Sequence, residues 1–123
     1  MKVTLISDTH NKHKQITEDI SGIGGDLLIH AGDISSRGYN HEIQQFCKWF
    51  NSLSYTCQVF IAGNHDFGFE KRPEETQEIL NSYKWITYLQ DDSMLFGADT
   101  ENCIKIYGSP WSPRFYDWAF NAD

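Results

Sequence analysis

Cysteine is scarce in this sequence, and its few residues are not arranged to form a bridge framework or to hold a metal. The three cysteines, Cys47, Cys57 and Cys103, are odd in number and widely spaced, and no two form a Cys-x-x-Cys pair. A disulfide framework and a zinc ribbon are therefore not indicated. We expect all three to be buried thiols in a reducing cytosol.

The sequence also has no long apolar run. A membrane helix needs roughly 20 apolar residues, and no stretch approaches that length. The apolar run at the N-terminus is interrupted at Asp8, so it does not have the form of a signal peptide. These absences predict a cytoplasmic protein with no membrane partner.

Basic residues are in deficit. Lysine and arginine number 10 against 17 aspartates and glutamates, which gives a formal net charge of −7. A field of that sign disfavours nucleic acid as a partner. It does not disfavour a small phosphate ester, because bound divalent cations would offset much of the local charge.

The chain of 123 residues predicts a single domain, 1–123, with a modest core. Three short apolar runs, at residues 3–6, 27–29 and 58–61, each lead into a loop of reactive side chains. These loops read Ser7-Asp8-Thr9-His10, His30-Ala31-Gly32-Asp33 and Ala62-Gly63-Asn64-His65-Asp66. Because open α/β sheets build their sites at the carboxyl ends of parallel strands, the pattern predicts an α/β fold with one site made by these loops.

The apolar spacing predicts the elements between the motifs. Residues 2–7 indicate a buried central strand, and residues 26–31 and 58–62 indicate strands parallel to it, joined by crossover helices. Residues 16–23 have helical spacing, and a longer helix is expected after Asn40 as N-cap, with Phe46 and Phe50 facing the sheet. Trp49 lies off that apolar stripe and could mark a partner surface.

The second half of the sequence predicts smaller elements. A helix is expected from Arg72-Pro73, because proline is favoured in the first turn. Residues 86–89 indicate a short strand, and residues 93–96 and 103–107 indicate a hairpin with a longer loop between its strands.

The three loops offer ligands for a cation. Asp8 and His10 lie two residues apart, so in a continuing strand they would share one face and present a carboxylate and an imidazole. Asp33 could use its two oxygens for two cations, and Asn64 offers an amide oxygen. Nitrogen and oxygen donors without a thiolate favour manganese, iron, zinc or nickel. The alternative for each residue alone is a cap on a turn.

The ordered set Asp-x-His, Gly-Asp and Gly-Asn-His-Asp resembles the calcineurin-like metallophosphoesterases over residues 2 to about 120. Residues 108–115, Gly-Ser-Pro-Trp-Ser-Pro-Arg-Phe, resemble the small single-domain branch of that family. The resemblance implies an α/β calcineurin-like fold. The chain would hold the N-terminal βαβαβ half with C-terminal strands and a hairpin, truncated relative to the family.

The resemblance also implies a mechanism, namely hydrolysis of a phosphate ester at a dinuclear metal site, with phosphodiesters favoured. Asp8 and His10 would bind the first metal, Asp33 would bridge, and Asn64 would bind the second, with manganese favoured. His65 would donate a proton to the leaving oxygen, so that His65 and Asp33 are the expected catalytic residues. Arg37 and His65 would contact the substrate, a small phosphate ester or a nucleotide. The alternative for Arg37 is a solvated arginine in a loop.

The sequence lacks part of the family pattern. The family continues to a further histidine and a Gly-His-x-His motif, whereas no histidine follows His65 here. We therefore expect an incomplete second metal site and low or no activity of this chain alone. The alternative is that a homo-oligomer or a complementing C-terminal chain supplies the missing ligands. Two other functions remain open: a truncated, weak or inactive binding module, and a nuclease, which the charge disfavours.

Other polar residues near the motifs have simpler expectations. His30 is expected to be a satisfied core histidine or a neighbour of the metal ligands, and His13 and His41 to face solvent. Asp66 has two alternatives, because it could hold the His65 imidazolium or cap the following turn. The aromatic residues of the C-terminal segment must pack on the body, on a second copy or on another segment. They are Trp111, Phe115, Tyr116, Trp118 and Phe120.

Overall fold

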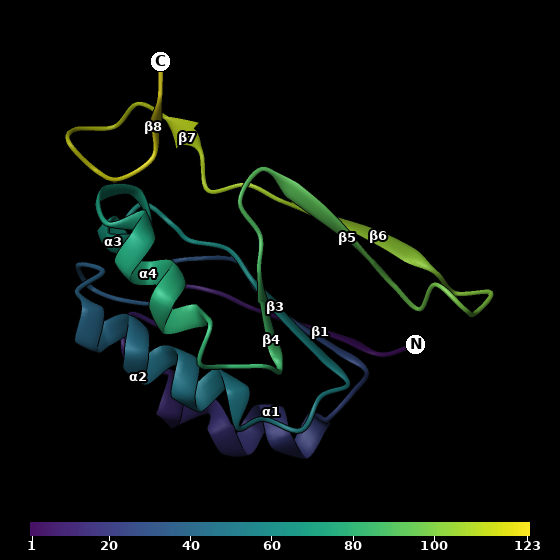
Figure 1. Ribbon diagram of the computed structural model, residues 1–123. Coiled ribbons are helices and arrows are strands. Elements are labelled where there is room, and N and C mark those ends of the chain that lie inside the picture. Colours follow the sequence, from purple (N-terminus) through teal and green to yellow (C-terminus); the bar gives the residue numbers. More distant parts are fainter.

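A four-stranded parallel sheet forms the centre of the structure, a computed structural model that describes all residues 1–123. Its strands are β1 (Val3–Ile6), β2 (Leu27–His30), β3 (Cys57–Phe60) and β4 (Ile86–Tyr88), in the spatial order β1-β2-β3-β4. All three pairings are parallel, with Leu5 opposite Ile29 and Ile29 opposite Val59. The expected α/β architecture is therefore present, and the carboxyl ends of β1, β2 and β3 lie together at one end of the sheet (Figure 1).

The helices cover one face of this sheet (Figure 1). They are η1 (His13–Ile16, a 3₁₀ helix), α1 (Thr17–Ile23), α2 (Asn40–Asn51), α3 (Phe67–Lys71) and α4 (Pro73–Leu80). The larger core cluster joins Leu28 and Phe60 of the sheet to Ile43, Phe46 and Phe50 of α2. The predicted apolar face of α2 is thus the main contact between helices and sheet. Helix α3 was not predicted from the sequence.

A hairpin covers part of the opposite face. Its strands β5 (Asp92–Phe96) and β6 (Ile104–Gly108) pair antiparallel, as the sequence predicts. Met94 and Ile106 of the hairpin pack on a smaller cluster built from Leu27, Val59 and Leu89. Two short strands, β7 (Ser112–Pro113) and β8 (Asn121–Ala122), follow and close the C-terminal segment (Figure 1).

The prediction of a buried central first strand is wrong. Strand β1 lies at the edge of the sheet, and Leu5 is 71% exposed. The register places Val3 and Leu5 level with Leu27 and Ile29, on the face that the hairpin covers. The hairpin does not bury these two side chains, because both remain exposed.

Three further expectations about burial are corrected. Trp49 is only 6% exposed, and its indole N–H donates to Thr17 Oγ1 at 2.8 Å, so it marks no partner surface. His13 is 2% exposed and packs on Trp49, with ring centroids 4.7 Å apart. Of the cysteines only Cys47 is fully buried, whereas Cys103 is exposed. The structure contains no helix with the length and hydropathy to span a bilayer.

Candidate metal centre

The loop after β1 is held against the loop after β2 by backbone hydrogen bonds. The amides of Asp8, His10 and Asn11 donate to the carbonyls of Gly32, Asp33 and Ile34 at 2.9, 3.1 and 3.1 Å. Asp8 and His10 adopt positive φ angles of 56° and 41°, so the strand does not continue through them. The expected strand geometry is therefore absent, and left-handed turns are what bring His10 Nε2 to 3.7 Å from Asp8 Oδ1.

His10 is oriented by a second hydrogen bond. Its Nδ1 lies 3.1 Å from the carbonyl oxygen of Ser35, and since a carbonyl only accepts, Nδ1 carries the proton. The other ring nitrogen, Nε2, lies 3.7 Å from Asp8 Oδ1 and 3.9 Å from Asp33 Oδ2. Nε2, the nitrogen left free to bind a cation, therefore faces two carboxylates, which is the arrangement of a metal-binding histidine.

His65 reaches the same point from the loop after β3. Its backbone N–H donates to Asp33 Oδ1 at 3.0 Å, and its Nδ1 donates to the Ser36 carbonyl at 3.2 Å. The His10 and His65 rings meet edge to face, with centroids 4.8 Å apart. Potential ligand atoms of His10, Asp33 and His65 all lie within 4.8 Å of one another.

Asp33 lies between the two histidines. Oδ1 accepts the His65 amide, and Oδ2 faces His10. The loop after β3 can approach this closely only because residue 63 is glycine: a Cβ at Gly63 would overlap Asp33 Oδ1. The sequence motif Gly-Asn-His-Asp thus includes its glycine for a steric reason.

Asn64 and Arg37 lie near the His10–Asp33–His65 cluster, and their polar side chains make no hydrogen bond within the chain. Asn64 is half-buried and makes no side-chain hydrogen bond within the chain, while its carbonyl accepts the Ala119 amide at 3.0 Å. Arg37 is exposed, and its guanidinium has no partner within the chain. It lines a groove with Phe67 and Trp118 and is not part of the His10–Asp33–His65 cluster.

Asp66 supports the loops and does not contact His65 through its side chain. Its carboxylate accepts the amides of Gly63, Ile34 and Ser35 at 2.8, 3.1 and 3.0 Å, and also the Ser35 hydroxyl. Burial raises the pKa of Asp66, and the hydrogen bonds from Ser35, Gly63 and Ile34 oppose that shift. Neither alternative describes this side chain: Asp66 is the N-cap residue of α3 but makes no side-chain hydrogen bond to that helix, and its carboxylate instead joins the loop after β2 to the loop after β3.

His30 and Glu42 are further buried polar groups beneath the site. His30 Nδ1 accepts the Gly32 amide at 3.2 Å, so its Nε2 donates to Thr9 Oγ1 at 2.9 Å, as expected for a satisfied core histidine. Burial lowers the pKa of His30 to about 4. Glu42, which sequence reasoning missed, accepts the amides of Ser36 and Tyr39 at 2.9 and 3.0 Å. Tyr39 is the N-cap of α2, one residue before the expected Asn40.

Trp118 is another residue that sequence reasoning missed. Its indole lies against the His65 imidazole, with ring centroids 4.2 Å apart. In the same segment Phe120 is buried and packs on Trp111 at 5.3 Å, whereas Phe115 and Tyr116 are exposed. The aromatic C-terminal segment therefore packs partly on the body, and one of its rings reaches the candidate site.

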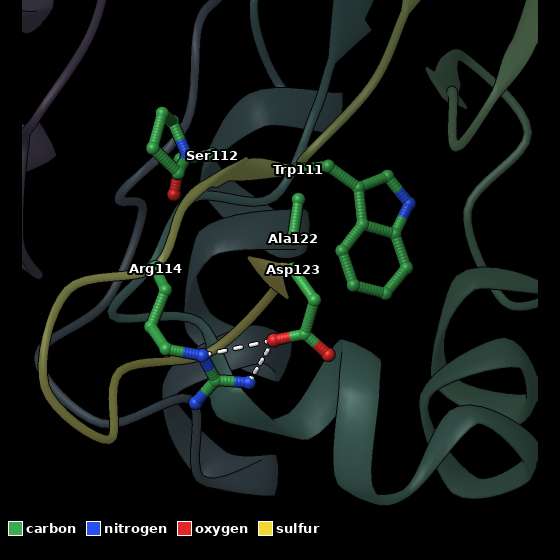
Figure 2. A pocket seen from close by; sticks show the side chains of 6 residues that line it. Trp111, Ser112, Arg114, Ala122 and Asp123 are labelled. Atoms are coloured by element: carbon green, nitrogen blue, oxygen red, sulfur yellow. Dashed lines mark hydrogen bonds and ion pairs between the residues drawn. The ribbon is translucent and has the colours of Figure 1, made fainter.

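A separate pocket of about 740 Å³ lies beside the paired strands β7 and β8 (Figure 2). It is lined by Trp111, Ser112, Pro113, Arg114, Ala122 and Asp123. Arg114 and Asp123 pair with each other there, with Arg114 Nε donating to Asp123 Oδ1 at 2.9 Å (Figure 2). None of the expected site residues lines this pocket, so the functional candidate is the His10–Asp33–His65 cluster.

Comparison with known proteins agrees with the geometry. Residues 1–119 match the family described as calcineurin-like phosphoesterase, and the chain belongs to that family. The chain is 34% identical over 140 residues to the human protein named metallophosphoesterase domain-containing protein 1. That match covers 98% of this chain and 40% of the human protein.

Two other relatives have names that do not mention a metallophosphoesterase. A Caenorhabditis elegans UPF0046 protein is 35% identical over 124 residues, which cover 90% of this chain and 41% of that protein. An Emericella nidulans protein named probable rhamnogalacturonate lyase C is 28% identical over 123 residues, with 98% of this chain but only 11% of that protein covered. The chain thus spans about two-fifths of the human and nematode relatives.

The donor set fits a divalent cation. The His10 imidazole, whose Nδ1 proton is directed at a carbonyl, and the carboxylates of Asp8 and Asp33 supply the nitrogen and oxygen ligands that manganese, iron, zinc and nickel accept. The His65 imidazole lies beside them, with its Nδ1 directed at the Ser36 carbonyl. The carbonyls of Ser35 and Ser36 fix both rings, and such contacts commonly change metal affinity 10–100-fold. The cluster is therefore a preformed candidate metal centre.

Proposed function

We propose that this chain hydrolyses a phosphate ester with the help of bound divalent metal, and that phosphodiesters are its preferred class. The observation that carries the proposal is the convergence of His10, Asp33 and His65 within 4.8 Å at the carboxyl ends of parallel strands. Membership of the calcineurin-like phosphoesterase family supports the reaction in general. A small ester or a nucleotide is the proposed substrate.

Asp8, His10 and Asp33 are the proposed ligands of a first metal, and Asp33 and Asn64 those of a second. Divalent metal bound there would polarise the phosphoryl group and make water a stronger nucleophile at neutral pH. Manganese is the proposed ion. The first site receives three ligands from this chain and the second only two, so we expect the second to be the weaker.

His65 is the proposed general acid. Its Nδ1 proton is held by the Ser36 carbonyl, so the proton available for transfer resides on Nε2. Donation from Nε2 to the leaving oxygen would contribute about 10²–10⁴ in rate. Arg37, whose guanidinium has no partner in the chain, is proposed to bind a phosphate oxygen.

Metal binding and turnover test the proposal together. Manganese titration by calorimetry should give at least one site in the wild type and a large loss of affinity in Asp33→Asn. The exposed residue Asp99 provides the matched control, Asp99→Asn. With manganese added, bis(nitrophenyl) phosphate should be cleaved by the wild type. Equal metal affinity in wild type and Asp33→Asn would refute the role of Asp33.

A second function, a non-catalytic binding module, is favoured by one observation. No histidine follows His65, so this chain offers only Asp33 and Asn64 to a second metal. A binding module would retain one metal and bind phosphate without turning over any ester. Metal stoichiometry measured beside turnover on the same preparation separates the two functions.

A further inference from the structure

A groove of about 410 Å³ lies next to the candidate metal centre and has no part in the proposed metal binding. It is lined by Arg37, Phe67, Phe115, Tyr116, Asp117 and Trp118. Most of these side chains are aromatic, and Arg37 is the one cation among them. Trp118 belongs to both places, because it lines the groove and contacts the His65 ring at 4.2 Å.

The segment that carries the groove is attached to the site loop itself. The Ala119 amide donates to the carbonyl of Asn64 at 3.0 Å, and the Phe120 amide donates to Glu70 Oε2 in α3 at 3.1 Å. Ala119 and Phe120 are buried, so this end of the loop is fixed next to α3, where Figure 1 shows it in yellow. The position of Trp118 beside His65 is therefore built into the fold.

The other end of the segment exposes apolar surface that nothing in the chain covers. Phe115 and Tyr116 are 60% and 76% exposed, and their rings contact each other at 4.6 Å. Phe67 lies nearly parallel to Trp118, at 6.3 Å and 27°. Adjacent exposed rings of this kind indicate a binding surface, and planar aromatic groups are the ligands that stack on them.

We propose that this groove, which we call the aromatic subsite, binds a planar aromatic ring carried by the leaving group of the ester, either an aryl ring or the base of a leaving nucleoside. The inference rests on the proposed function, because it places the phosphoryl group at the metal centre and the leaving oxygen at His65 Nε2. Whatever is bonded to that oxygen must extend past His65, whose ring lies between the proposed metal ligand His10 and Trp118, the groove residue in contact with it. Trp118 is then the residue that determines specificity.

Arg37 gives the groove a contact for an anionic group, beside the one carboxylate of its lining, Asp117. Its guanidinium lines the groove and is free of ion pairs, so it can hold a phosphate oxygen while the ring of the same ester stacks on Trp118. An alkyl ester would use only the first of these contacts. The subsite therefore discriminates between esters by their leaving group and not by their phosphate.

A pair of non-hydrolysable phosphonates tests the subsite without requiring turnover. Phenylphosphonate and methylphosphonate carry the same anionic group and differ in the ring. With manganese present, calorimetry on the full chain should show phenylphosphonate binding roughly tenfold more tightly, the size expected for one stacked ring. Tryptophan fluorescence should be quenched by phenylphosphonate alone.

Three variants locate the effect. Trp118→Ala and Phe115→Ala should reduce the discrimination to less than about twofold, which is the loss of most of one stacking contact. Phe115 is exposed, and its ring contacts Tyr116 and not His65. The variant Phe115→Ala therefore tests the groove without moving the imidazole. The control is Trp85→Ala, since Trp85 is 72% exposed and precedes β4 at the opposite end of the strands.

The outcomes separate this inference from the proposed function. Turnover of an ester with equal affinities for both phosphonates overturns the subsite alone. Ring-dependent binding that needs Trp118, without any turnover, supports the subsite and overturns hydrolysis. Failure of both phosphonates to bind overturns the subsite. A dimer in sedimentation experiments that dissociates in Trp118→Ala or Phe115→Ala also overturns it, because the groove would then be an interface between copies of the chain.

Discussion

At the scale of single residues, His30 connects two site loops through its two ring nitrogens. One accepts the Gly32 amide and the other donates to Thr9, which requires the neutral imidazole. Burial lowers the pKa of His30 to about 4, from an ordinary value of 6.5. Between pH 6.5 and about 4, His30 therefore binds a proton in the unfolded chain but stays neutral in the folded chain.

That difference predicts a loss of stability in mild acid. Between pH 6.5 and about 4 the unfolded state binds more protons, so the free energy of unfolding falls as the pH falls, by about 3 kcal/mol from this group. Urea unfolding at several pH values should show the slope, and His30→Gln should flatten it. His41→Gln, at an exposed position, is the control. A slope unchanged in His30→Gln would contradict the assignment.

Residue-level sequence reasoning singled out residues that the structure brings together, but not the residues that hold them in place. The motif residues are recognisable from their side-chain chemistry and their order in the sequence. They are Asp8, His10, Asp33 and His65. Trp118 and Glu42 act through contacts with residues remote in the sequence, and no local pattern encodes such contacts. His13 was misjudged because its lysine neighbours suggest solvent, whereas the 3₁₀ turn directs its ring onto Trp49.

At the scale of elements, the loop after β3 depends on its glycine. A methyl group at Gly63 would overlap the carboxylate and the amide of Asp33, so Gly63→Ala must push the two loops apart. We expect manganese affinity to fall by roughly tenfold or more, in the range seen when the supports of metal ligands are disturbed. Titration calorimetry measures the change.

Gly22 offers a matched control within α1. A Cβ added at Gly22 meets nothing within 4 Å. Gly22→Ala should leave metal affinity unchanged and raise stability by up to about 1 kcal/mol, because alanine is the better helix former. Equal metal affinities in the two glycine variants would show that the close approach of the loops is not required.

The elements themselves were largely predictable. The parallel strands, the apolar face of α2 and the hairpin β5–β6 follow from spacing that the chain carries locally. Helix α3 was missed because its five residues form less than two helical turns and show no periodicity. Trp49 was misplaced because η1 and α1 pack beside α2, which widens its buried face beyond one stripe.

At the scale of the whole molecule, the order of the strands decides which apolar residues are buried. Residues 3–6 and 27–30 are similarly apolar, yet β1 lies at the edge and β2 in the interior of the sheet. Whether a side chain at a sheet edge is buried depends on tertiary contacts that the local sequence does not encode. This is why the first strand was expected to be central and was found half-exposed.

Leu5 and Leu28 provide a direct test of that order. Leu5 is exposed on β1, whereas Leu28 is fully buried on β2. Leu5→Thr should change the free energy of unfolding by less than about 0.5 kcal/mol, and Leu28→Ala should reduce it by about 2–5 kcal/mol. Urea unfolding measures both. A large loss in Leu5→Thr would mean that β1 is covered in solution.

The carboxylates that join the loops have a consequence for amide hydrogen exchange. Loop amides usually exchange quickly with solvent, but those of Ile34, Ser35 and Gly63 donate to the buried carboxylate of Asp66. The Ile34 and Ser35 amides can exchange only when the β2 and β3 loops separate, and the Gly63 amide only when the β3 loop itself opens, which makes the candidate metal centre one of the slowly opening parts of the chain. In deuterium exchange these loop amides should be protected together, and their protection should disappear together in Asp66→Asn.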